Sequence, residues 1–108
     1  MHGTLCGRLE DLERLLLGLK FSVRRKDRRM VASRYVGIKG RWHFKARETG
    51  GNRIRFDFHW DWLVHLAYVF GSDHIRKPVV YYRHFLLPRL SKFRLRVVKL
   101  DVKFKASK

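Results

Sequence analysis

Histidine is the residue type in this chain best suited to moving protons near neutral pH or to binding a metal. Of the six histidines, His43 and His59 lie on segments that are predicted to pair, and Asp61 follows His59 by two residues. Such a group could assemble metal ligands, but a histidine on a basic strand more often contacts a phosphate or a base. Paired cysteines of the zinc-binding kind are absent, because Cys6 is the one cysteine. We therefore predict no metal and no cofactor.

Other catalytic motifs are also missing from the sequence. Gly50-Gly51 stands in a predicted hairpin turn, whereas a phosphate-binding loop joins a strand to a helix. Two-metal nucleases need clustered carboxylates, and Asp57, Asp61 and Asp73 are set among basic neighbours. We expect a protein that is not an enzyme. The enzymatic alternative is a metal-free ribonuclease, in which His, Lys, Arg and Tyr side chains move protons and stabilise phosphate charge.

Positive charge is the strongest signal in the sequence. Lys and Arg total 26 against 9 Asp and Glu, a net charge of +17. Residues 1–20 sum to zero, so the whole surplus lies in residues 21–108. A net charge of roughly 2–8 is enough to keep a small domain in solution, so a surplus of this size indicates a polyanionic partner. Nucleic acid is the usual one, and an anionic membrane surface is the alternative.

The cations that we expect to contact RNA phosphates belong to one turn and to several predicted strands. Residues 24–29 carry five positive charges and one negative charge, and a basic turn of this kind commonly reaches toward phosphates. In the strands, cations alternate with apolar residues and so share one face. The predicted RNA-binding residues are Arg24, Arg25, Lys26, Arg28, Arg29, Arg41, His43, Lys45, Arg47, Arg53, Arg55, Lys92, Arg94, Arg96, Lys103 and Lys105.

A β-hairpin is the clearest element that must position these cations. Residues 42–47 and 53–60 each alternate an apolar side chain with a polar, mostly cationic one. Between them stands the turn Glu48-Thr49-Gly50-Gly51-Asn52, which is rich in residues that tolerate positive φ. One face of the hairpin is therefore apolar and the other is basic.

Further strands are expected on both sides of this hairpin. Residues 20–25 and 30–36 flank the basic turn. The apolar run at 62–70 has a length that does not separate strand from helix, and we favour a buried central strand with a short helix close behind. Residues 79–82 after Pro78 indicate another strand, which ends near Pro88. Residues 93–104 indicate another, with a β-bulge at Val97-Val98 where the alternation slips by one.

The N-terminal segment differs from the rest in its pattern of leucines. Leucines that step by four and three residues predict one apolar stripe along a helix, with Thr4 as its N-cap. This helix either docks on a partner or packs on the protein's own sheet, and we favour the second. The stripe consists of Leu5, Leu9, Leu12, Leu16 and Leu19.

Together these elements predict an α+β fold, with an N-terminal amphipathic helix packed on a mostly antiparallel sheet of about five or six strands. A chain of 108 residues corresponds to one domain. We expect residues 1–108 to form a single basic nucleic-acid-binding domain, in which residues 1–20 are a neutral Leu-rich helix and residues 21–108 are strand-rich. No stretch of 18 apolar residues is present, so we predict no membrane span.

Three stretches of the chain carry a resemblance to a known family. They are Gly40-Arg41-Trp42-His43-Phe44-Lys45, then Asn52 to Phe58, then Leu63-Val64-His65-Leu66 to Lys77-Pro78. Together they resemble the central strands of the RelE-type ribosome-dependent endoribonuclease toxins, over roughly 40 residues. The resemblance implies metal-free RNA cleavage that depends on residues such as Arg55 and Tyr81. That family usually has two helices before the hairpin where this chain has one, and this chain ends in a long basic strand.

Function is predicted from the spread of cations over nearly all of residues 21–108, without a concentrated recognition helix. We expect an RNA-binding, in particular rRNA-binding, basic protein that is a structural component of a ribosome or another ribonucleoprotein particle. Its expected partners are RNA and neighbouring proteins of the particle. A RelE-like ribonuclease and a DNA-binding or viral nucleic-acid-binding protein are the alternatives. The single Cys6 and the lack of a signal peptide predict an intracellular location, which includes an organellar ribosome.

Overall fold

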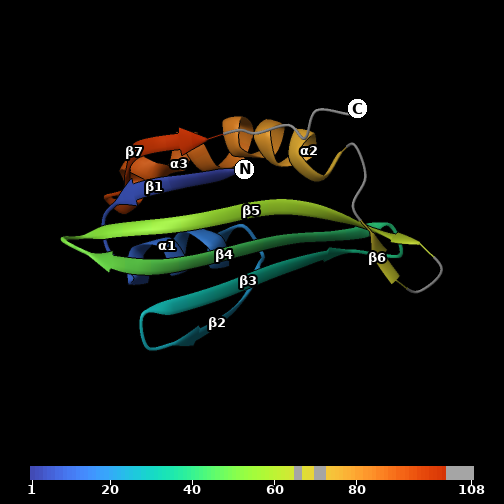
Figure 1. The fold of residues 1–108 in the computed structure, drawn as a ribbon, viewed down its shortest axis with the longest axis horizontal. Coiled ribbons are helices and arrows are strands. Elements are labelled where there is room, and N and C mark those ends of the chain that lie inside the picture. The colour runs from blue at the N-terminus through green and yellow to red at the C-terminus, as the bar shows by residue number, and fades with distance from the viewer. Residues whose placement is uncertain (65–66, 70–72, 102–108) are drawn as a thin grey trace.

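The computed structural model describes residues 1–64, 67–69 and 73–101, and an antiparallel sheet forms its centre (Figure 1). Strands follow one another in the order β2-β3-β4-β5-β1-β7, and β6 pairs with β5 off this path. Every strand pairing among the described residues is antiparallel. The strands are β1 (His2–Cys6), β2 (Ser22–Lys26), β3 (Arg29–Val36), β4 (Gly40–Gly50), β5 (Arg53–Val64), β6 (Ala67–Val69) and β7 (Arg96–Asp101).

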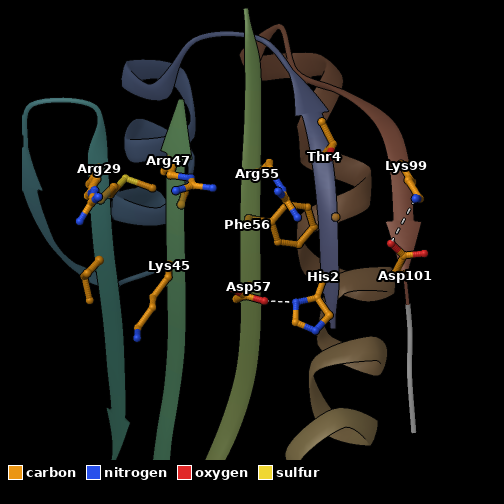
Figure 2. A pocket seen from close by; sticks show the side chains of 14 residues that line it. His2, Thr4, Arg29, Lys45, Arg47, Arg55, Phe56, Asp57, Lys99 and Asp101 are labelled. Carbon is orange, nitrogen blue, oxygen red and sulfur yellow. Dashed lines mark ion pairs between the residues drawn. The ribbon is translucent and has the colours of Figure 1, made fainter. Parts of the chain in front are cut away.

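The helices lie on one face of this sheet. α1 (Leu9–Gly18) follows β1, and a longer helical segment precedes β7. That segment consists of α2 (Asp73–Tyr81), a π-helical turn (Tyr82–Leu86), α3 (Leu87–Leu90) and a 3₁₀ turn (Ser91–Phe93). Within the described residues, no helix covers the opposite face, which points toward the viewer in Figure 2. The α+β class is thus confirmed, and the sheet has one covered face and one open face.

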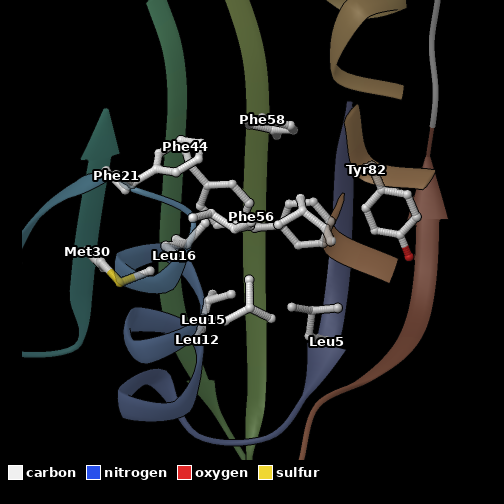
Figure 3. Packing of buried hydrophobic residues seen from close by; sticks show 14 of the residues in the cluster. Leu5, Leu12, Leu15, Leu16, Phe21, Met30, Phe44, Phe56, Phe58 and Tyr82 are labelled. Carbon is white, nitrogen blue, oxygen red and sulfur yellow. The ribbon is translucent and has the colours of Figure 1, made fainter. Parts of the chain in front are cut away.

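The core fills the space between the helices and the covered face. Phe44, Phe56 and Phe58 point from β4 and β5 into this space, and each is at most 4% exposed. The rings of Phe44 and Phe56 stack with their centroids 5.3 Å apart. Four leucines of α1 complete this layer and are likewise buried (Figure 3); they are Leu9, Leu12, Leu15 and Leu16. Burial of these apolar groups is the main force that holds the helix on the sheet.

The prediction of a helix beginning near Thr4 is wrong, because residues 2–6 form β1 between β5 and β7. Leu5 therefore faces the core from a strand, and α1 begins only at Leu9. The leucine spacing is compatible with a helix from Leu5 onward. In residues 2–6, however, the backbone groups are satisfied by pairing with β5 on one side and β7 on the other. The larger helical segment lies near the C-terminus, where the sequence predicted only a short helix behind the apolar run at 62–70.

The predicted strand at residues 79–82 is also wrong, because these residues belong to α2 and the π turn. The prediction followed from β-branched and aromatic residues, whose preference for strands depends strongly on context. Burial instead recurs at Pro78, Tyr81, Tyr82 and Leu86, with the spacing of a helix that faces a core. The described part of the apolar run at 62–70 is divided between β5 and β6.

The hairpins and the bulge are confirmed. β2 and β3 pair around the basic turn, and β4 and β5 pair around Gly51 and Asn52, which both have positive φ. In β7, Val97 pairs with Leu5 whereas Lys99 pairs with Thr4, so Val98 is the extra residue of a bulge.

Close packing of β1 against β5 gives a test of this arrangement. A Cβ placed on Gly3 would lie 2.6 Å from a ring carbon of Phe56 and 2.9 Å from the carbonyl oxygen of Lys99. We expect Gly3→Ala to lower the free energy of unfolding by about 1–3 kcal/mol, as overpacking usually does. Urea unfolding measures the change. Gly18→Ala is the control, since a Cβ there meets nothing within 4 Å and alanine favours the helix by roughly 1 kcal/mol; equal effects of the two changes would contradict the packing.

Candidate nucleic-acid interface

The open face of the sheet collects most of the predicted RNA-binding cations. Along β4 and β5 the side chains that alternate with the buried rings are cationic, imidazole or carboxylate groups. The strand register brings the polar positions of the other strands onto the same side. We call this surface the basic face; its cations are Arg24, Lys26, Arg29, Arg41, Lys45, Arg47, Arg53, Arg55, Arg96 and Lys99, and its histidines are His2, His43 and His59.

One row of cations crosses the whole basic face at right angles to the strands. In the strand register, each position of this row pairs with the next one, in the strand order β2, β3, β4, β5, β1 and β7. Thr4 of β1 stands between the last two members (Figure 2). The row borders a shallow concavity of about 650 Å³. We call it the cation row; its members are Lys26, Arg29, Arg47, Arg55 and Lys99.

The cation row is poorly neutralised by the protein itself. Among the described residues, Arg29, Arg47 and Arg55 form no ion pair with a carboxylate. Lys99 lies 3.7 Å from Asp101, and both side chains are largely exposed. Like charges on neighbouring strands destabilise a sheet, so an external anion would stabilise this arrangement.

A polar cluster lies farther along β4 and β5 on the same face. His43 Nδ1 and His59 Nε2 are 3.0 Å apart and share a hydrogen bond. The Asp61 carboxylate lies 3.6 Å from His59 Nε2 and accepts a hydrogen bond from Arg41 Nε at 3.0 Å. Burial would lower the pKa of Arg41, but Asp61 and Tyr35 more than offset this and raise it. The guanidinium therefore stays charged, and the cluster can present both cations and imidazoles to a phosphate.

The pKa of His43 is lowered below the 6.5 of a free histidine. Burial is the main cause, the positive charges of Arg41 and Lys45 add to it, and the negative charge of Asp61 opposes it. At neutral pH the imidazole is thus neutral and can accept a proton.

Acidification from about pH 7.5 to about pH 5.5 should therefore destabilise the protein partly through His43. The unfolded chain takes up the proton first, so the stability from neutral His43 is complete above pH 6.5 and is lost as the pH falls toward the folded-state pKa. One such group changes the free energy of unfolding by at most ~1.4 kcal/mol per pH unit. Urea unfolding at both pH values should show a smaller loss for His43→Gln than for the natural chain. The same loss in both would contradict the assignment.

Some predicted binding residues do not join the basic face. Arg25 turns toward α1, where its guanidinium lies 3.4 Å from Glu13, because Val23 and Arg25 share the covered side of β2. Arg28 lies in the turn between β2 and β3. Lys92 and Arg94 belong to the end of the helical segment, where Arg94 has a φ of 60°. The strand expected from residue 93 begins only at Arg96. Lys103 and Lys105 lie outside the described residues.

Lys99 of the cation row and its neighbour Thr4 were not among the predicted binding residues. Lys99 reaches the cation row because the bulge at Val98 shifts the phase of β7, and Thr4 reaches it because residues 2–6 are a strand. The slip at Val97-Val98 was the signal that could have placed Lys99. No local signal in the sequence indicated the position of Thr4.

The RelE-like interpretation requires an accessible Tyr81, and the partner-docking interpretation requires an accessible leucine stripe. Both lie on the covered face. The Tyr81 ring packs among Trp42 and Phe58, with centroid distances of 4.6 and 5.6 Å, and burial raises its pKa. Tyr81 and Arg55 thus lie on opposite sides of the sheet and do not form one site. The leucine stripe is buried in the chain's own core, which corrects the idea that it docks on a partner; the exposed fractions of Leu5, Leu9, Leu12, Leu16 and Leu19 are 2, 0, 1, 0 and 8%.

In residues 1–64, 67–69 and 73–101, no group of three or more His, Cys, Asp or Glu side chains is arranged to hold a metal ion, and the cluster of His43, His59 and Asp61 is not such a group. No helix in these ranges has the length and apolarity needed to cross a bilayer.

Comparisons with known proteins add no relative to this description. A scan against protein-family models, a search of curated proteins and a search of solved structures each found no match to the chain.

Proposed function

We propose that this protein binds RNA through the basic face, by contacts to phosphate groups, as a structural component of a ribosome or another ribonucleoprotein particle. The observation that carries the proposal is the cation row, in which Arg29, Arg47 and Arg55 lie on adjacent strands without carboxylate partners among the described residues. Arginine forks bind phosphate oxygens in a planar, two-pronged geometry. A row of them on a rigid sheet is suited to a polyanion.

Electrostatics supports the same conclusion at larger scale. The net charge of +17 would attract a polyanion at long range and speed its association at low salt. The basic face adds a fixed surface to this general attraction, since each strand is held by its neighbours. Phosphate contacts of this kind provide affinity and orientation with little reading of sequence, as a structural component of an RNA particle requires.

Salt-dependent RNA binding tests the proposal. Affinity for a structured RNA should fall between about 50 and 200 mM salt, with a slope of log K against log salt of about −3.5 to −4.5 if the five cations of the row each neutralise one phosphate. In an extract, the protein should sediment with ribonucleoprotein particles at low salt and leave them at high salt. Failure to bind any RNA at low salt would refute the proposal.

A metal-free ribonuclease is the second candidate, and the His43–His59 pair is the observation that favours it. One imidazole would take the proton of a 2′-hydroxyl, whose oxygen attacks the adjacent phosphorus, and the 5′-oxygen would leave with a proton from an imidazolium. The products would be a 2′,3′-cyclic phosphate and a 5′-hydroxyl. Incubation of labelled RNA with the protein and a chelator decides the matter: cleavage that His43→Gln abolishes would establish the activity, and intact RNA would exclude it.

A further inference from the structure

The width of the cation row limits which nucleic-acid surfaces it can touch. Its members occupy five of the six strands from β2 to β7, and neighbouring strands lie about 4.8 Å apart, so the row spans roughly 24 Å. The major groove of B-form DNA, which proteins enter with a helix or a two-stranded ribbon, is only about 12 Å wide. A sheet face of this width must lie across backbones and cannot enter such a groove.

The position of the aromatic rings limits the ligand further. Proteins that bind single strands stack bases on exposed aromatic side chains. Here Trp42, Phe44, Phe58 and Trp60 all lie on the covered side and are at most 9% exposed. On the described part of the basic face the aromatic residue is Tyr35, which pairs with Arg41 at the end of β3 remote from the cation row. Apart from the His2 imidazole, which contacts Asp57, the described side chains that line the cation row offer no exposed ring on which a base could stack.

The groups beside the cations fit the sugar edge of an RNA helix. Thr4 stands between Arg55 and Lys99 in the register, toward the β7 end of the row, and its side chain is half-buried. The minor groove of A-form RNA is wide and shallow and displays 2′-hydroxyls next to the phosphates. A hydroxyl set among cations can therefore meet a 2′-hydroxyl while its neighbours contact the backbone.

We propose that the ligand of the basic face is the backbone of double-helical RNA, bound across its shallow groove without regard to base sequence. This inference rests on the proposed function and narrows it from RNA in general to the A-form duplex.

Binding to matched ligands tests the inference. The full chain is titrated into a labelled RNA duplex of about 20 base pairs, a second duplex of scrambled sequence, either strand alone, and the DNA duplex of the same sequence. A dsRNA-binding surface commonly spans about 16 base pairs, so this length suffices. We expect the two RNA duplexes to bind equally, and the single strands and the DNA duplex to bind about tenfold more weakly, a difference of ~1.4 kcal/mol.

The outcomes separate this inference from the proposed function. The inference would be overturned if single strands or duplex DNA bound as tightly as duplex RNA. It would also be overturned if the protein preferred one of the two duplex sequences. In both cases the proposal of RNA binding would stand. Absence of binding to every ligand would overturn both.

Discussion

The double variant Arg47→Glu/Arg55→Glu is expected to bind structured RNA about 100-fold or more weakly than the natural chain. These two arginines are neighbours in the cation row, at the centre of the sheet. A hydrogen bond to a charged group contributes about 1.5–3 kcal/mol, so the loss of two contacts alone accounts for a change of this size. The salt slope should become shallower by about 1.4–1.8, the contribution of two phosphates. Fluorescence anisotropy at several salt concentrations measures both quantities.

A matched control separates the cation row from net charge. Arg83 is exposed on the π turn of the helical layer, and a second exposed cation, Lys92, lies on the 3₁₀ turn that follows α3. The variant Arg83→Glu/Lys92→Glu changes the net charge by the same amount as the double arginine variant. It should keep most of the affinity. If both double variants weaken binding equally, the protein attracts RNA by its overall charge and the basic face is not the binding surface.

The second large effect is expected at Leu12, whose replacement by aspartate should unfold the protein. Leu12 is 1% exposed beneath the sheet. Truncation of such a leucine usually lowers stability by about 2–5 kcal/mol, and an unpaired carboxylate at the same place adds a desolvation cost of several more. The sum approaches the about 5–15 kcal/mol of stability that a domain of this kind possesses. Far-ultraviolet circular dichroism during heating should show no cooperative transition, or one at a much lower temperature.

Leu17 provides the control for this change on the same helix. It is 50% exposed on the outer side of α1, so Leu17→Asp should alter the free energy of unfolding by less than about 1 kcal/mol and leave RNA binding intact. A Leu12→Asp protein that melts like the natural chain would show that α1 is not anchored by its leucines, and the description of the core would fail.

The two sets of variants also test whether binding and folding are separate properties of the two faces. Arg47 and Arg55 are exposed and lie on the open side. Reversing both charges exchanges one like-charged pair for another and makes an opposite-charged pair with Arg29, so the change should not unfold the sheet. Leu12 acts only from the covered side. A two-faced sheet predicts that the double arginine variant loses RNA binding but keeps its structure. It predicts that Leu12→Asp loses both.

The two faces of the central hairpin could be predicted from the sequence, because side chains of a strand alternate whatever the rest of the fold does. The alternation at 42–47 and 53–60 therefore indicated both the buried rings and the cations opposite them. The slip at Val97-Val98 indicated the bulge for the same reason. The excess of Lys and Arg is the basis for the proposed polyanionic partner.

Only the tertiary structure decided which cations stand together. Lys99 and Arg55 become neighbours through Thr4 because β1 inserts between β5 and β7, and no local pattern records a pairing between segments so far apart in the chain. The same pairing made residues 2–6 a strand although their leucine suited a helix, and packing against the core made residues 79–82 helical although their composition suited a strand. Local preferences differ by only about 1 kcal/mol, so long-range pairing and burial determine the outcome wherever they favour a different structure.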